Sequence, residues 1–322
     1  MIAKRLLNGF DRWAADLHLR MAGEQPGLSI FLFHSIYEDE RAVGNSTVFP
    51  QERMTVELFR EFLDYFSTQG YYFLTPHQLV TESLDPDKRY GLVTFDDGYF
   101  NNTLVLDALK EYRVPALLFI STWYVQEQKS FWSDVAYREL KKRGVSDDKI
   151  LRQIMALKTK KVSTIFEELD VEFGRNCSHP VGDADRPLTL SELHSMAQHP
   201  FIHIGNHTHR HEVLTNLDRA EIVYEIEQCQ HVLEQNIGYR PDWISYPNGS
   251  YNDTVLCVCR EDGFRAGITT VQQKNSIGQL AENDTASLLL SRFNPVAVRG
   301  QLDFRRMRAS LQLKTRLKQW LQ

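Results

Sequence analysis

Short apolar runs alternate along this chain with stretches whose apolar residues recur at helical spacing. LSIFLFH at 28–34 predicts a buried strand, because a strand covered on both faces is continuously apolar. TVELFREFLDYFSTQG at 55–70 has apolar residues three and four apart and ends at glycine, which is typical of an amphipathic helix. The other expected strands are 71–75, 91–95, 116–121, 201–206, 242–247, 265–270 and 287–293. The other expected helices of this alternation are a short one at 75–82, then 102–112, 219–238 and 253–263.

Regular alternation of strands and helices indicates a parallel sheet with crossover helices. About eight strands within residues 28–300 favour a closed or nearly closed α/β barrel over an open sheet. One interval, at about 131–200, is far longer than a normal crossover. It is charged and helix-prone from 134 to 170, and it restarts a helix at 188–199. We therefore expect a distorted (β/α) barrel with a helical insertion over one rim.

The two ends of the chain predict amphipathic helices outside this barrel. Residues 1–27 carry an apolar stripe flanked by basic residues, and 301–322 form a basic segment. Within 303–318 there are six Lys and Arg residues against one Asp. These helices either pack on the barrel with solvated charges or hold the protein at an anionic membrane surface.

Composition restricts the class of protein and its expected location in the cell. The chain has 322 residues, 42% of them hydrophobic and 25% charged, as in ordinary globular proteins. A net charge of −5 argues against nucleic acid as the main partner, and no apolar run approaches the roughly 20 residues of a membrane span. The N-terminus lacks the apolar centre and cleavage site of a secretory signal. Four scattered cysteines fit neither a disulfide framework nor a paired zinc motif, so we expect a cytoplasmic protein.

Polar side chains follow the expected strands. In a parallel barrel the carboxyl ends of the strands form one face, and that face carries the chemistry. Segments more than 200 residues apart should therefore converge on one mouth. The residues concerned are His34, Asp96, Asp97, His207, Tyr246, Asn248 and Arg292.

A divalent metal site is the chemistry that these types favour. His207 and His211 are four residues apart, so on a helical turn or a tight loop they face the same way. With Asp97 as third ligand they would leave positions open on a metal, as catalysis requires. Asp96 then remains free to take a proton, and His209 lies between the ligands and faces away. An isolated H-x-x-x-H or DD is more typical of surface or capping residues, and their joint occurrence after successive strands favours a site.

Three motifs resemble those of the polysaccharide deacetylases, carbohydrate esterase family 4. They are TFDDG at 94–98, HTHRH at 207–211 and SYPNGSYN at 245–252, in the family's order and over roughly residues 28–295. The resemblance implies a distorted (β/α) barrel. It also implies that Asp96 is the base, that Asp97, His207 and His211 bind the metal, and that YPNG lines the groove.

Two departures from the family pattern concern proton transfer. The third motif lacks the arginine that many members pair with the catalytic aspartate, and LLLSRFNP at 288–295 has Arg292 where many members have a histidine. The chain thus resembles the branch acting on biosynthetic exopolysaccharide or lipid-linked sugars more than the peptidoglycan branch. We expect Arg292 to pair with Asp96. His34 is the candidate proton donor; alternatively it is a hydrogen-bonded histidine that lines the mouth.

The expected reaction is removal of N-acetyl groups from N-acetylhexosamine units of a polymeric or lipid-linked sugar. Zn²⁺ is the expected ion, since it lowers the pKa of bound water to about 7 and polarises a carbonyl. The Tyr246 backbone N–H would help to hold the oxyanion, and Asn248 would contact substrate. Trp132 would offer an aromatic face to the sugar and Asp134 a polar contact; alternatively this pair is a packed helix start with Asp as its cap.

Two other classes of function stay open at this point. A degenerate carbohydrate-binding protein would have lost its proton donor with the missing histidine. A scaffold would bind a partner through its basic terminal helices and keep an inert barrel. Acetate release would exclude the first, and metal in the purified protein would argue against the second.

Overall fold

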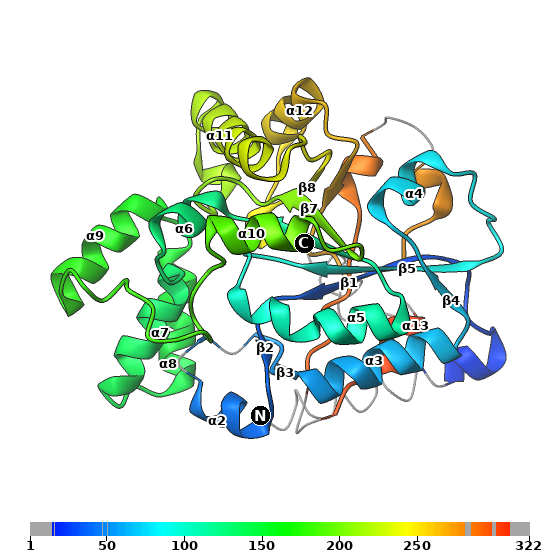
Figure 1. Ribbon diagram of the computed structural model, residues 1–322, viewed down its shortest axis with the longest axis horizontal. Helices are drawn as coiled ribbons and strands as arrows, with labels where there is room; N and C mark the ends of the chain where they lie inside the picture. Colours follow the sequence, from blue (N-terminus) through cyan, green and yellow to red (C-terminus); the bar gives the residue numbers. More distant parts are fainter. Residues whose placement is uncertain are drawn as a thin grey trace.

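The computed structural model describes residues 15, 17–46, 48–49, 51–280, 285–297 and 301–309. At its centre is a curled, parallel sheet of seven strands in the order β1-β5-β6-β7-β8-β9, with β4 also paired to β5 (Figure 1). The strands are β1 (Gly27–Phe33), β4 (Tyr71–Phe73), β5 (Arg89–Phe95), β6 (Ala116–Ile120), β7 (Ile202–Asn206), β8 (Trp243–Ser245) and β9 (Ala266–Ile268). A separate pair joins β2 (Ile36–Tyr37) to β3 (Met54–Thr55). The expected distorted (β/α) barrel is confirmed in its parallel, curled sheet.

The register of the sheet brings the strand ends together. Phe33, the last residue of β1, pairs with Phe95 at the end of β5. Ile120 at the end of β6 pairs with Asn206 at the end of β7. Because parallel strands finish at one edge, the residues that follow them emerge on one mouth of the barrel.

The expected strand 287–293 is wrong as a regular element. Residues Ser287–Leu289 form a short 3₁₀ turn, η5, and the following residues make single bridges to two different neighbours. Leu290 bridges Ile268 of β9, and Phe293 bridges Phe31 of β1, both in parallel sense. The segment thus crosses from β9 to β1 and closes the barrel without forming a ladder.

Helices cover the outside of the sheet. α3 begins at the cap Thr55, whose side chain accepts from the Leu58 N–H, and its phenylalanines pack on β1. The Phe33 ring lies 5.1 Å from that of Phe59 and 5.1 Å from that of Phe62. The expected helix 102–112 starts instead as a 3₁₀ turn, η1 (Phe100–Val105). The covering helices are α3 (Val56–Thr68), α4 (Pro76–Thr81), α5 (Leu106–Tyr112), α10 (Leu190–Ala197), α11 (Arg219–Ile237) and α12 (Asp253–Asp262). The remaining short elements of the described residues are α2 (Glu40–Asn45), α6 (Thr122–Glu127), η2 (Leu214–Asn216), η3 (Pro247–Gly249) and η4 (Ile277–Leu280).

The interval expected as one insertion, 131–200, divides into two parts. Helices α7 (Trp132–Lys142), α8 (Asp147–Leu157) and α9 (Val162–Phe173) stand at one side of the barrel (Figure 1). Their buried residues form a separate core that includes Val135, Ile150 and Leu169. α10 belongs to the barrel, because its Leu193 and Met196 lie in the main core. We call α7–α9 the helical insertion.

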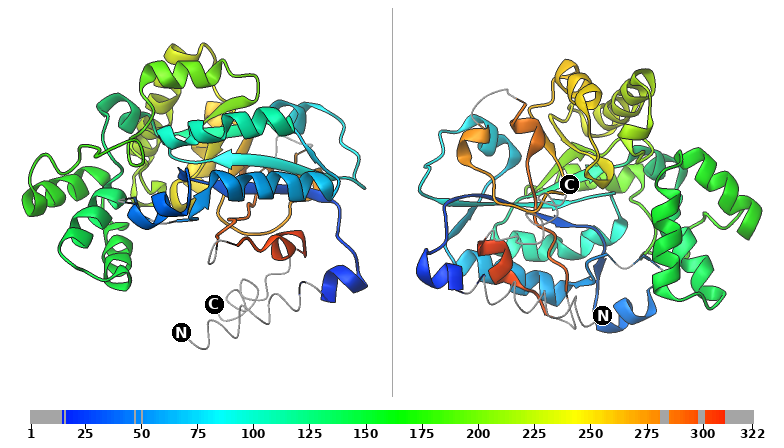
Figure 2. Two further views of the ribbon diagram at one scale, coloured as in Figure 1. Left: turned by 60° about the horizontal axis from the view of Figure 1, so that its bottom comes forward. Right: turned by 180° about the vertical axis from the view of Figure 1, so that it is seen from behind.

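The terminal segments are described only in part. Residues 17–21 are helical, and α13 (Phe304–Ala309) lies on the side of the barrel that carries α3 (Figure 2). The Phe304 ring stacks on Tyr65 of α3 at 4.3 Å. Arg308 donates to the buried carboxylate of Glu24 at 2.7 Å. The start of the basic C-terminal segment therefore packs on the barrel, and residues 1–14 and 310–322 lie outside the described residues.

All four cysteines are free thiols. Within the described part of the chain, no helix combines the length and apolar character needed to cross a bilayer.

Candidate active site

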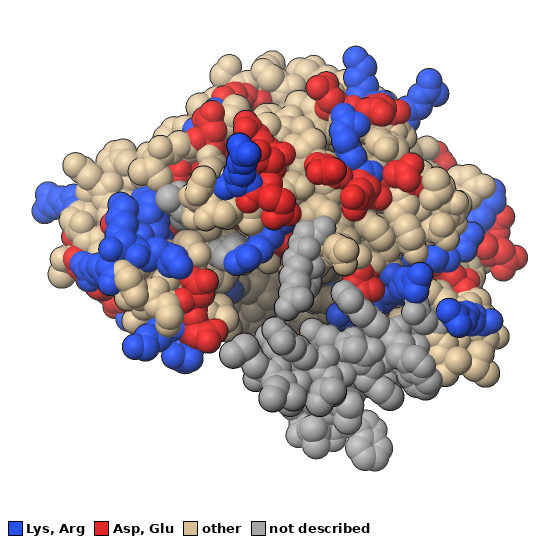
Figure 3. Space-filling view, turned by 90° about the horizontal axis from the view of Figure 1, so that it is seen from below, with Lys and Arg blue, Asp and Glu red and all other residues tan. Residues whose placement is uncertain are grey.

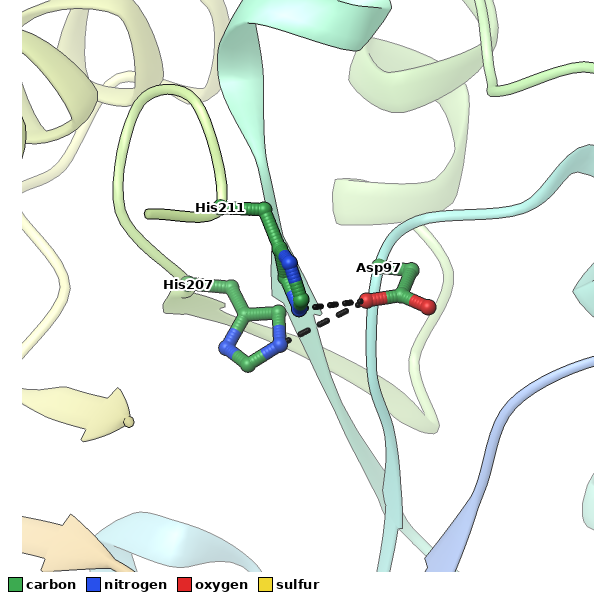
Figure 4. Close-up of side chains that lie close together, drawn as sticks. All are labelled: Asp97, His207 and His211. Atoms are coloured by element: carbon green, nitrogen blue, oxygen red, sulfur yellow. Dashed lines mark ion pairs between the residues drawn. The ribbon is translucent and has the colours of Figure 1, made fainter. Parts of the chain in front are cut away.

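Three side chains with metal-binding atoms meet at the mouth of the barrel. Asp97 follows β5, and His207 and His211 begin and end the loop after β7 (Figure 4). Both histidines direct Nε2 at Oδ1 of Asp97, at 3.5 Å for His207 and 3.3 Å for His211. The candidate ligand atoms all lie within 4.8 Å of one another. This group, which we call the Asp-His-His cluster, is the one expected from the sequence.

The chemistry of these atoms fits a divalent ion. Oδ1 of Asp97 is buried and accepts no hydrogen bond, which is costly unless a cation satisfies it. The Ser245 carbonyl accepts from Nδ1–H of His207 at 2.7 Å, which leaves the Nε2 lone pair of that ring free to ligate. Burial lowers the pKa of His211 to about 4, so this imidazole is neutral, as a ligand must be. Burial opposes ionisation of Asp97, but the nearby histidines, His207 foremost, still lower its pKa.

The backbone around the cluster is held in a sparsely populated conformation. Asp97, Thr208 and His211 have φ values of 79°, 63° and 58°. Such angles cost energy for residues with a Cβ and gather at functional sites. The loop is supported from below, since the Asn206 side chain accepts from Thr208 N–H at 2.8 Å and the Glu225 carboxylate from Arg210 N–H at 2.7 Å. These backbone conformations thus lower the stability of the fold, and they direct the two histidines toward one aspartate.

Asp96 forms a bidentate ion pair beside the cluster, and its Oδ2 also lies 3.5 Å from Nε2 of His207. Its Oδ1 and Oδ2 accept from the two terminal nitrogens of Arg292 at 2.8 and 2.5 Å. Ser245 Oγ donates to the same carboxylate at 3.2 Å. Burial disfavours the charged form of Asp96, but Arg292 and then His207 outweigh it and hold the pKa well below its usual range. Asp96 is therefore an ionised carboxylate kept next to the Asp-His-His cluster.

His34 is paired with a carboxylate that the sequence did not single out. Its Nδ1 lies 2.8 Å from Oε1 of Glu52, a residue only 1% exposed. Burial opposes protonation of His34, but Glu52 and the nearby aspartates raise its pKa to about 9. His34 is thus protonated at neutral pH, with Nε2 left for another partner. No local signal in QERM at 51–54 marks Glu52 as buried, because its place depends on the loop that carries it.

A cavity of about 270 Å³ joins these groups to the helical insertion. The barrel side contributes His34, Asp96, Asp97, His207, His211, Arg292, Asn248, Leu32, Gln51, Thr270 and Asn294, and the insertion side contributes Phe131, Trp132, Ser133, Ile154 and Lys158, with Phe49 also lining the cavity. Trp132 and Asn248 therefore lie where a substrate contact was expected. The cavity thus combines aromatic, charged and amide groups in one lining.

Two expected contacts are wrong. Asp134 is 1% exposed, and its carboxylate already accepts from the Phe49 N–H at 2.9 Å and the Tyr99 hydroxyl at 2.6 Å. It fastens the insertion to the barrel instead of facing the substrate. The Tyr246 N–H donates to the Ile268 carbonyl at 3.1 Å, because β8 and β9 continue to pair past Ser245. This N–H is therefore not free for an oxyanion.

His209 lies behind the cluster. It is 4% exposed, and its Nδ1 contacts the hydroxyl of Thr122 at 2.9 Å. Burial lowers its pKa to about 4. The expectation that it faces away from the cluster agrees with this position, although it is buried and not exposed.

Comparison with known proteins gives the family. The family model described as polysaccharide deacetylase matches residues 83–267, more than half of the chain. The chain belongs to the polysaccharide deacetylase family. The matched region contains Asp96, Asp97, His207 and His211, so the resemblance drawn from the motifs is confirmed.

Individual relatives are distant. YxkH of Bacillus subtilis is 26% identical over 251 residues, which cover 77% of this chain and 66% of that protein. The alignment thus spans slightly less than two thirds of YxkH. A Streptococcus pyogenes deacetylase, PplD, solved with acetate, is 19% identical with a TM-score of 0.57, covering 84% of this chain and 93% of that one. A de-N-acetylase from Aggregatibacter actinomycetemcomitans is 16% identical with a TM-score of 0.59, covering 88% and 99%. At these identities the two structures support the barrel fold of the family.

Proposed function

We propose that this protein removes N-acetyl groups from N-acetylhexosamine units of a polymeric or lipid-linked sugar, in a metal-dependent hydrolysis that releases acetate. The observation that carries the proposal is the joint geometry of one cavity. It holds the Asp-His-His cluster beside Asp96, an ionised carboxylate kept charged by Arg292. Family membership supports the substrate class.

Zn²⁺ is the ion that the ligand set suits best. Two imidazole nitrogens and one carboxylate oxygen are a donor set that zinc accepts, with positions left open for water and substrate. Bound there, the ion would acidify a water molecule and polarise the acetyl carbonyl. Asp97, His207 and His211 would hold it.

We assign proton transfer to two residues, Asp96 and His34, each of which is held in one of the ion pairs described above. Asp96 takes the proton from the attacking water as general base, since Arg292 keeps it ionised. His34, charged through Glu52, gives a proton from Nε2 to the leaving sugar amine. The retained acid and base favour an enzyme over a degenerate sugar-binding protein.

The oxyanion needs a donor other than Tyr246. The first N–H groups of a helical turn find no partner within it. Pro247 opens the turn η3 and has no N–H, so Asn248 supplies the first one. Asn248 lines the cavity, and we assign its backbone N–H to the oxyanion. Trp132 would offer its ring to the sugar from the opposite wall.

Acetate release is the direct test. Zinc-reconstituted protein is incubated with neutral chitooligosaccharides and with a lipid-linked N-acetylhexosamine, and both acetate and new amine are measured. We expect activity in the wild-type chain and a fall of about 10²–10⁴-fold in Asp96→Asn with zinc retained. Sugar binding without acetate from any of these substrates would favour the degenerate carbohydrate-binding protein.

Location is a separate part of the proposal. We place the enzyme in the cytoplasm, with the basic segment 301–322 at an anionic leaflet. The support is the charge pattern of the sequence alone. α13 packs on the barrel, and the later basic residues lie outside the described residues. Co-sedimentation with anionic and neutral vesicles across a salt series tests it. Equal binding to both would contradict membrane contact through charge.

A further inference from the structure

Lys158 enters the cavity from the helical insertion. It is the C-cap that follows α8, and it lines the cavity together with Asp97 and His211. Its ammonium donates to the side-chain oxygen of Asn248 on the opposite wall. Its backbone carbonyl accepts from Nδ2 of Asn216, in the turn η2 that follows the histidine loop, at 3.0 Å. Both ends of Lys158 are thus fixed against the barrel.

The charge of Lys158 has no close counter-ion within the described part of the chain. Its hydrogen bond goes to a neutral amide, and Asp97 acts on it only at longer range. Burial lowers the pKa of Lys158, which shows that the cation is partly removed from water, while Asp97 raises it. Burying an ammonium without a carboxylate beside it has a desolvation cost, and an anionic ligand that paired with the ammonium would offset this cost.

The other charged groups at this cavity are already matched. Arg292 is neutralised by Asp96, and His34 by Glu52. A divalent ion at the Asp-His-His cluster would more than balance Asp97. Positive charge therefore exceeds negative charge in the loaded cavity, and Lys158 is the cation left over. Figure 3 shows both basic and acidic side chains on the left of the molecule, the side on which the insertion stands in Figure 1.

We propose that Lys158 is a specificity-determining residue that binds an anionic substituent, a carboxylate or a phosphate, on the sugar that carries the acetamido group. The inference rests on the proposed function, because it takes the acetamido group to sit at the cluster. One cavity of about 270 Å³ contains both the cluster and Lys158, so a single small ligand reaches both. The protein would then select anionic N-acetylated sugars over neutral ones.

A different role for Lys158 makes a different prediction. If its ammonium stabilised the tetrahedral oxyanion, its loss would lower kcat for neutral and anionic sugars alike. If it binds a substituent, its loss weakens only substrates that carry the charge. The comparison of two substrate classes in one variant therefore separates the roles.

The test uses Lys158→Gln, which removes the charge but keeps an N–H donor for Asn248. Lys160→Gln is the matched control, because Lys160 is an exposed lysine two residues away that pairs with Glu168. Zinc-loaded proteins are assayed with N-acetylglucosamine, N-acetylglucosamine 6-phosphate and N-acetylmuramic acid. We expect the wild-type chain to prefer at least one anionic sugar in kcat/KM by about 10–100-fold, as for hydrogen bonds to charged groups. Lys158→Gln should lose that preference with neutral turnover kept, and Lys160→Gln should keep both.

Binding gives a second readout that does not need turnover. In the Asp96→Asn background, calorimetry should show the preferred anionic sugar bound about 10–100-fold more weakly when Lys158 is also replaced by Gln. Comparing the phosphorylated sugar with the sugar that carries a carboxylate shows which anion the protein recognises. Equal losses for neutral and anionic sugars, or no anionic preference in the wild-type chain, would overturn the proposal. Absence of acetate from these sugars and from the oligomeric and lipid-linked ones, with an intact Lys158-dependent binding difference, would instead refute the proposed function alone.

Discussion

Replacing Arg292 by methionine removes the cation that keeps Asp96 ionised. The two side chains are each 2% exposed, so water and salt screen the pair little. An arginine at this distance lowers a carboxyl pKa by about 1–3 units, and each unit corresponds to about 1.4 kcal/mol. Without Arg292, burial would be opposed mainly by His207 and His34, so the pKa of Asp96 should rise by about 1–3 units. The base would then lose its charge at a higher pH than it does in the wild-type chain.

The pH dependence of stability should be weaker in Arg292→Met than in the wild-type chain. In the wild-type chain the pKa of Asp96 is lowered by folding, so its contribution is present above the unfolded pKa and is lost as pH falls toward the folded one. In Arg292→Met the folded pKa moves closer to the unfolded value, so this pH-dependent contribution to stability becomes smaller. Removing Arg292 leaves Asp96 as an unpaired buried charge, which should lower the free energy of unfolding by about 3–5 kcal/mol near neutral pH.

The assay is the pH dependence of kcat/KM for acetate release by zinc-loaded protein. The acid limb should move upward by about 1–3 units in Arg292→Met. Arg292→Lys serves as control, because it keeps a cation but loses the bidentate geometry, and it should shift the limb less. Urea unfolding at pH 5 and pH 8 measures the stability change. An acid limb that stays in place in Arg292→Met would refute the assignment of Arg292 as the group that ionises Asp96.

Three further predictions concern the cluster, the proton donor and the insertion. His211→Ala should lose bound zinc by elemental analysis, and wild-type zinc content would contradict its role as ligand. Glu52→Gln should lower the pKa of His34 from about 9 by about 1–3 units, so the basic limb of the rate profile moves down; an NMR titration that leaves His34 unchanged would count against the pairing. Asp134→Asn should reduce the free energy of unfolding by about 1–3 kcal/mol, because two hydrogen bonds are weakened, while KM stays the same. A raised KM with unchanged stability would restore Asp134 as a substrate contact.

Strand and helix positions could be predicted where local pattern and tertiary burial agree. β5 and β6 are buried along nearly their whole length, so their apolar runs stand out in the sequence. α11 begins with a capping box between Asp218 and Glu221 and ends at Gly238 with φ of 85°, both readable signals. Residues 287–293 were misjudged for the opposite reason. Their backbone bonds go to separate partners, such as Ser291 N–H to the Asn275 side chain and Arg292 N–H to the Val271 carbonyl.

Some residues of the site could likewise be predicted from the sequence, and others could not. Asp97 and His207 could be placed together because each lies within two residues of the end of a strand in one parallel sheet. Glu52 and Lys158 could not, since a loop and the packing of the helical insertion bring them to the mouth. Asp134 had the residue type of a substrate contact, and only the fold shows that Phe49 and Tyr99 occupy its carboxylate.

A zinc titration followed by acetate release tests the central claim most directly. Protein freed of metal is titrated with Zn²⁺, and bound zinc and the rate of acetate release are measured in the same samples. The account predicts no acetate without metal, a rate that rises in proportion to bound zinc, and saturation near one ion per chain. Acetate release that proceeds at full rate without bound metal would contradict it, and so would stoichiometric binding at the Asp-His-His cluster with no release from any N-acetylated sugar.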